Sequence, residues 1–374
     1  MARDSAPIVS VEHPQKLWNW VLAKQGIGTP AKPDSVRAAA NRSLGLHAAR
    51  LSSPLVAAAV RVDDDVDLSP LVGATDDALI TIRCMRKTLH TLPFDLASSA
   101  HAATRHYRLR DVQRLAVRAE VSQGELTALQ EKIHGYLLDA ASASHRDVER
   151  AVTPTNQSPI PARIALKLLW ERGDVVYRNT SDRWLRETRM FSLASLTHPG
   201  FITTLEPESA RDQLIEQYFQ RYGPATVKDV MWWAAIPAKA VVEALAARDV
   251  VRMRLPWAPS PFWMLRSDYD AFLRQPNSSV DEAGAALLGH EDIALKAYFE
   301  SRGRYLGALP ARKVFNQIGE VLPSIVHAGR VVGRWQWDPA DRRIRYRRFP
   351  GSDGTRTATA QAAAALEKRL RLLT

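Results

Sequence analysis

The sequence has a single cysteine, Cys84, among its 374 residues. A disulfide joins two cysteines, and thiolate zinc sites usually use two or more, so we expect neither within this chain. No apolar run reaches the roughly 18 residues of a membrane span. The first residues, MARDSAPIVS, lack the apolar core of a secretory signal. These absences predict a cytoplasmic protein with no membrane association.

Acidic residues are also in deficit. The chain has 51 Lys and Arg against 40 Asp and Glu, a formal net charge of +11. Because the usual polyanion inside a cell is nucleic acid, this excess favours a nucleic-acid partner. Arginines crowd residues 342–348, where we expect Arg345 and Arg347 to contact phosphates. A basic surface that only keeps the protein in solution is the alternative.

The chain shows no ligand-like grouping of metal-binding side chains. The acidic residues at 63–65 and 67 lack the spacing and the glycine of a calcium loop, so we interpret them as a solvated turn. The remaining candidates are histidines scattered along the sequence: His101, His106, His134 and His145. We expect neither a metal ion nor a cofactor.

The periodicity of apolar residues predicts mainly helices, with short strands that arrive in pairs. A helix over Ile160–Arg172 is followed by two strands, and the same order recurs between residues 208 and 266. A helix followed by a two-stranded hairpin is typical of a winged helix. The expected fold class is therefore mainly α with short β hairpins, as tandem winged-helix modules and a C-terminal β-rich, barrel-like element.

Composition divides the predicted fold into five parts. Residues 141–161 are rich in Ser, Thr and Pro and give the best linker. We expect a first module with a helical extension over 1–140, a second over 162–206 and a third over 207–275. Residues 276–374 would form the C-terminal element and its terminal helix.

Three segments carry a resemblance to a known family. CMRKTLHTLP (84–93), RYGPATVKDVMWW (221–233) and VLPSIVHAGRVVGRWQW (321–337) resemble landmark segments of the AlkZ/YcaQ family of DNA glycosylases. Their order and spacing fit that family across nearly the whole chain. The resemblance implies a concave basic surface and a monomeric, nucleoid-associated enzyme. It also implies that this enzyme hydrolyses the bond between a modified base and its sugar in double-stranded DNA, leaving an abasic site.

The catalytic triplet of that family is altered here. The family places Gln-hydrophobic-Gln or Gln-hydrophobic-Asp after a Gly-Leu or Gly-Val pair. In the matching stretch, Gly45-Leu46-His47-Ala48-Ala49-Arg50, His47 takes the first position and Ala49 the last. Three interpretations stay open: His47 is catalytic, the water-positioning pair lies elsewhere, or the chain has lost activity.

Histidine would change the chemistry of the reaction. An alkylated cationic purine leaves readily, whereas an uncharged base needs help from a group that moves a proton. A histidine of ordinary pKa near 6.5 can accept the proton of the water or protonate the base. The substitution thus suggests uncharged modified bases, although bulky alkylated purines, crosslinks and hypermodified phage bases all stay open. The last option would make the protein a defence enzyme.

Other candidates lie around His47 in the sequence. Asn41 could orient a water or be an ordinary polar helix residue, and Arg50, expected one helical turn from His47, could contact a phosphate. The resemblance places Arg86, Thr88 and His90 near the cleft, as DNA contacts or as ties to the first module. From the family we also expect a shallow, solvent-open pocket at His47. The alternative function is a winged-helix DNA-binding protein without chemistry, a lesion sensor or transcription regulator.

Overall fold

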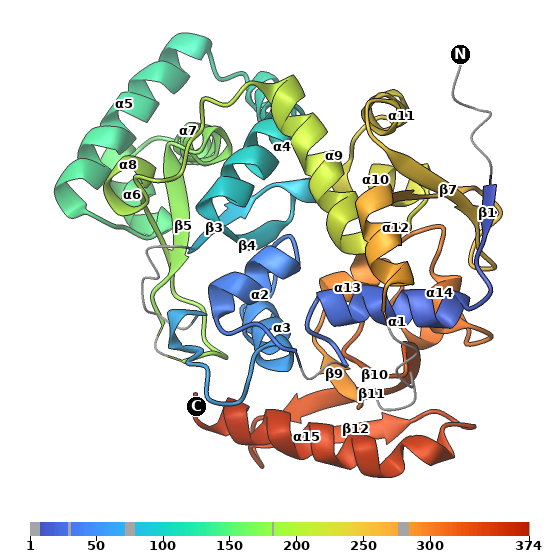
Figure 1. Ribbon diagram of the computed structural model, residues 1–374. Helices are drawn as coiled ribbons and strands as arrows, with labels where there is room; N and C mark the ends of the chain where they lie inside the picture. Colours follow the sequence, from blue (N-terminus) through green and yellow to red (C-terminus); the bar gives the residue numbers. More distant parts are fainter. Residues whose placement is uncertain (1–7, 29–30, 72–78, 182, 276–283, 374) are drawn as a thin grey trace.

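The computed structural model describes residues 8–28, 31–71, 79–181, 183–275 and 284–373 (Figure 1). The extreme N-terminus and the start of the expected C-terminal element, residues 276–283, lie outside the described residues. No helix in the described ranges is long and apolar enough to cross a bilayer. The chain forms a mixed structure in which helices separate several small sheets.

The helices follow the predicted apolar periodicity closely. The longest of them, α4, runs without a break over 25 residues. The complete set of α-helices that the structure describes is α1 (Pro14–Lys24), α2 (Val36–Arg42), α3 (Ser52–Arg61), α4 (Phe94–Arg118), α5 (Gln123–Ala140), α6 (His145–Val152), α7 (Ile160–Arg172), α8 (Ala194–Thr197), α9 (Pro207–Tyr222), α10 (Val227–Ala234), α11 (Ala238–Ala246), α12 (Arg266–Leu273), α13 (Ile293–Lys296), α14 (Gly303–Leu306) and α15 (Arg356–Arg371).

The strands form four small sheets. The first three have the orders β1-β7-β8, β2-β4-β3 and β5-β6, and the fourth has the order β12-β11-β10-β9. Their bounds are β1 (Ile8–Ser10), β2 (Leu46–His47), β3 (Leu79–Arg83), β4 (Leu89–Pro93), β5 (Val175–Asn179), β6 (Arg189–Leu193), β7 (Val250–Arg254), β8 (Phe262–Leu265), β9 (Ala286–Leu288), β10 (Ser324–His327), β11 (Arg330–Asp338) and β12 (Arg343–Arg348). Helix-then-hairpin order recurs at α7-β5-β6 and α11-β7-β8, and the winged-helix interpretation of these units stays a prediction.

The C-terminal element is an open sheet, which corrects the expected barrel-like shape. The edge strands of this sheet are β12 and β9, and these two strands do not pair with each other in the described part of the chain. Four strands are too few to close around a filled interior, for which about eight are typical. Helix α15 instead packs along β12 and β9, and it forms the outermost layer of the molecule together with the sheet (Figure 1).

The segment expected to be a linker contains a packed helix. Within residues 141–161, Ser144 caps α6 by accepting a hydrogen bond from the backbone N–H of Asp147. Val148 and Val152 then bury themselves against α5 and α7. Although this stretch is rich in Ser and Pro, the spacing of its two valines allows a helix that packs against its neighbours. The linker and the other expected module boundaries stay predictions.

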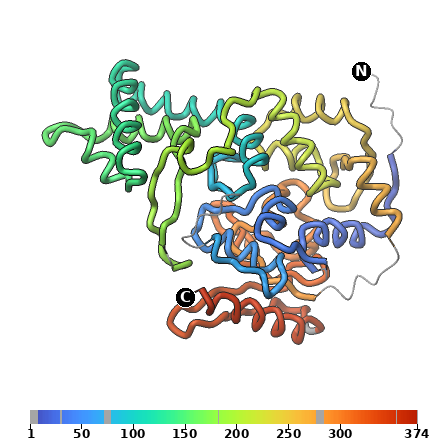
Figure 2. The backbone as a smooth tube through the Cα atoms, turned by 60° about the vertical axis from the view of Figure 1, so that its left-hand side comes forward, coloured from blue at the N-terminus to red at the C-terminus, as the bar shows by residue number. Residues whose placement is uncertain are grey.

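The β5–β6 hairpin connects the middle of the chain to its C-terminal layer. Its connecting loop places Trp184 in a core cluster with residues of β11, β12 and α15. The ring of Trp184 meets that of Trp337 edge-on at 5.5 Å. In Figure 2 this hairpin extends down from the helical region toward α15. The contact fixes the C-terminal layer against the rest of the chain.

A buried ion pair joins the N-terminal third of the chain to its C-terminal third. Arg61, at the end of α3, donates two hydrogen bonds of 2.9 and 2.7 Å to the carboxylate of Asp292. Both side chains are completely buried. Asp292 also caps α13 by accepting from the backbone N–H of Ala294. Removing either partner would leave an unpaired charge inside the protein.

We therefore predict that Arg61→Ala lowers the free energy of unfolding by about 3–5 kcal/mol, because Asp292 keeps its charge without a partner. Urea denaturation measures this loss. The matched control is Arg163→Ala, which breaks the exposed Arg163–Glu149 pair and should have a much smaller effect. Equal losses in the two variants would contradict a structural role for the buried pair.

Candidate active site

The position of His47 follows from the way α2 ends. Leu44 and Gly45 both adopt positive φ angles, 47° and 91°, which stop the helix and turn the chain into β2. A side chain at position 45 would meet Leu92 at 2.7 Å, so only glycine fits. His47 then pairs with His90 of β4. His47 thus lies on a strand, which corrects the expectation that Arg50 follows it by one turn of a helix.

The imidazole of His47 is buried without a hydrogen bond. Its residue is 4% exposed, and no described group bonds to either ring nitrogen. Nε2 lies 3.9 Å from Oε2 of Glu291, and the ring meets that of His90 edge-on at 5.3 Å. Burial, helped by the nearby cations, lowers the pKa of His47 well below its ordinary value, so the ring is neutral at pH 7. A buried, unpartnered and neutral imidazole is free to bind a water or a ligand.

Glu291 is the residue that the sequence analysis missed. It follows β9 with a φ of 57°, a backbone conformation that non-glycine residues seldom adopt. Its Oε1 accepts hydrogen bonds from Nζ of Lys296 at 2.8 Å and from the backbone N–H of Val321 at 2.5 Å. Its Oε2 lies 3.9 Å from both His47 and Arg86. One carboxylate oxygen is therefore tied down, and the other faces His47.

The cations of the cluster lie against one tryptophan. The guanidinium of Arg86 lies 4.3 Å from the ring centre of Trp232, and Nζ of Lys296 lies 5.0 Å from it. Burial lowers the pKa of Arg86 to about 10, so it stays protonated at pH 7, and burial also lowers the pKa of Lys296. Trp232 stacks on Phe299 with ring centres 5.6 Å apart. Two cations around one carboxylate leave the cluster with excess positive charge.

Arg86 lies in a strained turn between β3 and β4, and this turn positions its side chain in the cluster. Arg86 and Lys87 both have positive φ angles, 51° and 65°. The hydroxyl of Thr88 donates to the carbonyl of Met85 at 3.0 Å, and the hydroxyl of Tyr107 donates to that of Cys84 at 3.1 Å. Thr88 therefore holds the turn rather than reaching outward. Strain of this kind is typical of functional sites.

Three of the predicted site residues meet at this cluster: His47, Arg86 and His90. His90 is buried behind His47, with Nδ1 3.3 Å from the carbonyl of Thr88. Burial lowers the pKa of His90 to about 3. His90 is 1% exposed, so the structure favours its interpretation as a tie to the first module over a contact with DNA.

The other predicted residues lie elsewhere. Asn41 accepts a 2.8 Å hydrogen bond from Arg221 at its side chain and a second at its carbonyl, which ties α2 to α9. This geometry favours the structural interpretation of Asn41. Arg50 is exposed and lies 3.6 Å from Glu320. Arg345 is exposed and paired with Asp338 at 2.6 Å, and Arg347 is exposed on the same strand.

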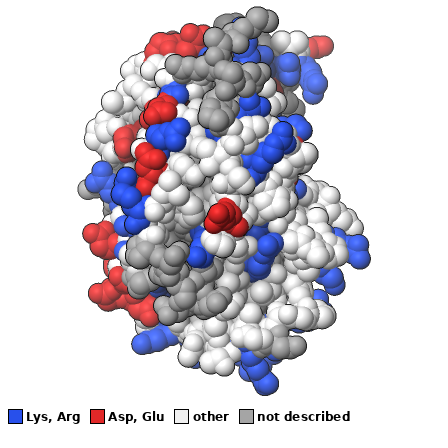
Figure 3. Space-filling model, turned by 45° about the vertical axis from the view of Figure 1, so that its right-hand side comes forward, with Lys and Arg blue, Asp and Glu red and all other residues white. Residues whose placement is uncertain are grey.

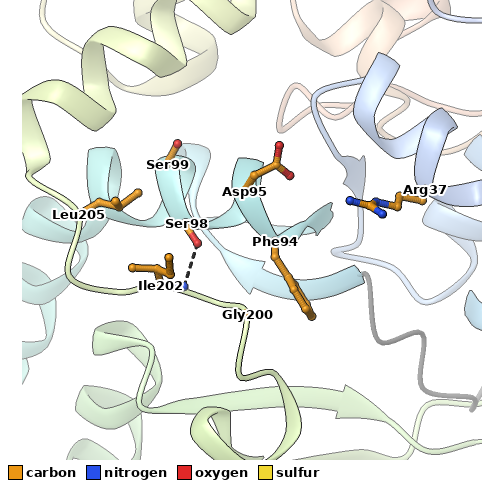
Figure 4. Close-up of a pocket in the computed structure, with 8 residues that line it drawn as sticks. All are labelled: Arg37, Phe94, Asp95, Ser98, Ser99, Gly200, Ile202 and Leu205. Atoms are coloured by element: carbon orange, nitrogen blue, oxygen red, sulfur yellow. Dashed lines mark hydrogen bonds between the residues drawn. The ribbon is translucent and has the colours of Figure 1, made fainter.

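A separate pocket of about 570 Å³ lies between α4 and residues 200–205. Figure 4 shows Arg37 and Asp95 on one side of it and the hydrogen bond from the backbone N–H of Ile202 to Ser98 on the other. None of the predicted site residues lines it. The 4% exposure of His47 also disagrees with the shallow, open pocket that we expected beside that residue.

Comparisons with known proteins give the following findings. A family model described as DNA glycosylase AlkZ-like matches residues 40–369, a range that includes His47 and Glu291. Among solved structures, the Streptomyces sahachiroi DNA glycosylase AlkZ is similar, with a TM-score of 0.77, 20% sequence identity and 97% of each chain covered. No match was found among curated protein sequences. At 20% identity the structural similarity speaks for the fold, while the family model spans most of the chain.

The buried histidines predict an acid-labile fold. Below about pH 6.5 the unfolded chain protonates His90, whereas the folded protein does so only near pH 3. Stability should therefore fall as the pH drops below 6.5, by about 1.4 kcal/mol per pH unit for this residue. His90→Gln should make the pH dependence of the unfolding free energy shallower by that amount, measured by urea denaturation between pH 6.5 and 5.

The control for this experiment is His145→Gln, which removes a histidine from an exposed position on α6 and leaves the buried cluster intact. If His90→Gln and His145→Gln show the same pH dependence as the unmodified protein, burial of a neutral His90 does not account for acid lability.

Proposed function

The chain belongs to the AlkZ-like DNA glycosylase family, and from this premise we propose that it hydrolyses the N-glycosidic bond of a modified base in double-stranded DNA. The product is an abasic site, and we propose that the enzyme works as a monomer at the nucleoid without a cofactor. The observation that carries the proposal is His47, buried, unpartnered and 3.9 Å from a carboxylate oxygen of Glu291. Its position in the family triplet supports the same assignment.

The proposed reaction places one water between His47 and Glu291. A water can donate hydrogen bonds to Nε2 and Oε2 together, because two bonds of about 2.8 Å can meet at one oxygen when the two acceptors are 3.9 Å apart. The neutral imidazole accepts a proton as the water oxygen bonds to C1′ of the sugar. The bond from C1′ to the base breaks, and the base leaves with the electron pair. The Glu291 carboxylate stabilises the positive charge that develops on His47 and the sugar.

Glu291 also accounts for the residue that the family triplet lacks. Ala49 stands at the second Gln or Asp position, and its side chain has no polar atom and lies at the surface. Glu291 supplies a carboxylate next to His47 from a segment far away in the sequence. We therefore propose that the water-positioning pair consists of His47 and Glu291, with the second member displaced to the C-terminal part of the chain.

The charge of the cluster favours an uncharged base. Arg86 and Lys296 would repel a cationic N-alkylpurine, whereas both stabilise the negative charge that an uncharged base acquires as it leaves. Enzymatically hypermodified bases of phage DNA are of this kind. On such a substrate the protein would act as a defence enzyme. We propose uncharged modified bases as the preferred substrates and alkylated purines as poor ones.

We propose that DNA binds to the arginines of the β11–β12 hairpin. On the side of the molecule in Figure 3, Lys and Arg are scattered and, along one edge, interleaved with Asp and Glu. The described residues on that side therefore form no continuous basic surface. On β12, by contrast, Arg343, Arg345 and Arg347 alternate with residues that point the other way. Arg334 of β11 is the cross-strand partner of Arg347.

We predict that His47→Ala lowers the single-turnover rate of base release by about 10²-fold or more, while DNA affinity is retained. His47→Gln should recover part of the rate on a cationic N7-alkylguanine and little on an uncharged base. Mass spectrometry of the bases released from alkylated plasmid and from modified phage DNA gives both rates. Full activity of His47→Ala would remove His47 from the mechanism.

The pH dependence of the same rate tests the direction of proton transfer. Because the pKa of His47 is well below 6.5, the neutral base is present throughout pH 6.5–8. The rate should be level in that range and fall on acidification as the imidazole is protonated. A rate that rises on acidification would instead assign His47 as the acid that protonates the leaving base.

We predict that Arg347→Ala weakens DNA binding for all sequences and reduces the slope of log affinity against log salt by about one, because one phosphate contact is lost. Arg345→Ala should have less effect, since Asp338 and Asp341 already neutralise this guanidinium. Fluorescence anisotropy at several salt concentrations measures both. The exposed Arg146→Ala is the control, and an Arg347→Ala slope equal to that of the control would exclude the hairpin from the DNA surface.

A further inference from the structure

Lys296, at the end of α13, is the one lysine that is buried in the part of the chain that the structure describes. Its side chain is 8% exposed, and an amine is costly to bury unless its neighbours replace the lost contacts with water. In the reaction proposed above, Lys296 contributes only its charge. A buried primary amine beside a catalytic carboxylate is also a nucleophile, and the proposed base release makes no use of that property.

The amine of Lys296 is held in a defined position. Nζ donates a hydrogen bond to the carbonyl of Gly319 at 2.8 Å and lies 2.8 Å from Oε1 of Glu291. The backbone N–H of Lys296 donates to the carbonyl of Asp292 at 2.9 Å, and Asp292 is fixed by its buried pair with Arg61. The amine is therefore fixed relative to the Glu291 carboxylate.

The amine and the proposed water contact the same carboxylate. The water would bond to Oε2 of Glu291, whereas Nζ of Lys296 contacts Oε1, so two hydrogen bonds and the width of one carboxylate separate them. The water oxygen bonds to C1′ of the sugar during base release. Once the base has left, rotation of the flexible four-carbon side chain of Lys296 can bring Nζ to the same carbon.

Among the described groups that contact Glu291, Lys296 alone can form an imine with an abasic sugar. Such a sugar opens to an aldehyde at C1′, and a primary amine condenses with an aldehyde. The guanidinium of Arg86 keeps its proton at pH 7, and the imidazole of His47 is not a primary amine. Burial, helped by the nearby arginines, outweighs the effect of Glu291 and lowers the pKa of Lys296, which increases the fraction of neutral amine.

We propose that Lys296 gives the protein a second activity, a lyase reaction in which Nζ attacks C1′ of the abasic product and the DNA strand is then cut. This inference rests on the proposed function, whose product is the substrate of the lyase. Nζ passes one proton to Glu291 and attacks C1′ as the neutral amine. A second proton moves from the nitrogen to the aldehyde oxygen, and Glu291 returns the first proton to that oxygen. The oxygen leaves as water, and an iminium ion remains.

The iminium ion makes the hydrogens on the neighbouring carbon, C2′, acidic. Glu291, which is ionised again, accepts one of these protons, and the electron pair forms a double bond between C1′ and C2′. The bond from C3′ to its phosphate oxygen then breaks, and the phosphate leaves with the electron pair. Water hydrolyses the remaining imine, which frees Lys296 and leaves an unsaturated aldehyde at the 3′ end of the cut strand.

The test uses the full-length protein and a duplex in which a separate uracil glycosylase has already made one abasic site. Sodium cyanoborohydride reduces the iminium ion to a stable secondary amine, so protein and DNA migrate together in a denaturing gel. We expect a trapped complex, a strand cut on the 3′ side of the abasic site without reductant, and mass spectrometry that locates the sugar on Lys296. Lys296→Arg should abolish trapping, because a guanidinium keeps the charge but does not form the imine.

The matched control is Lys228→Arg. The amine of Lys228 also lies 2.8 Å from a carboxylate, that of Glu300, but its side chain is 60% exposed. This variant should trap as much DNA as the unmodified protein. Mapping of the adduct uses the unmodified protein and so does not depend on the folding of any variant.

Three results would overturn the lyase: no trapped complex with the unmodified protein, an adduct on a different amine, or trapping that persists in Lys296→Arg. Because the duplex is abasic from the start, the result is independent of base release. Release of a modified base without an adduct would leave the proposed glycosylase function standing alone. An adduct on Lys296 without release of any modified base would support the lyase and contradict the proposed function.

Discussion

The buried carboxylate of Glu291 is the constraint on which the site depends. An ionised carboxylate is costly to bury unless charges and hydrogen-bond donors surround it. Lys296, Arg86 and the N–H of Val321 meet this requirement, and they come from α13, the β3–β4 turn and the segment before β10. Because all three groups contact the Glu291 carboxylate, its negative charge holds three segments together that are distant in the sequence. The arrangement also leaves one oxygen of Glu291 without a hydrogen bond from these groups, and that oxygen faces His47.

The neighbours of Glu291 extend this arrangement through the protein. His290 lies 3.6 Å from Glu320 at the 316–320 turn, and Asp292 forms the buried pair with Arg61 of α3. Three consecutive polar residues after β9 thus connect the turn that contains Glu320, the cluster around His47 and helix α3. The proposed chemistry at His47 therefore depends on buried contacts that also join distant parts of the chain.

Patterns among neighbouring residues were enough to predict many helices and hairpins and to single out His47 of the proposed His47–Glu291 pair. The helices and hairpins follow from apolar periodicity, and Gly45 with the altered triplet points to His47. The sequence could not reveal Glu291, because its contact with His47 spans about two thirds of the chain and no motif marks a buried carboxylate. The open C-terminal sheet, the helix inside the expected linker and the separation of Arg50 from His47 likewise depend on tertiary packing rather than on local pattern.

The central claim is that His47 and Glu291 act on one water as a pair. A double-mutant cycle with His47→Ala, Glu291→Gln and the double variant, measured as single-turnover base release, tests it most directly. If the two residues act together, the double variant is no slower than the slower single variant, because either change already disables the pair. Rate losses that multiply in the double variant would show that the two residues act independently, and this result would contradict the claim.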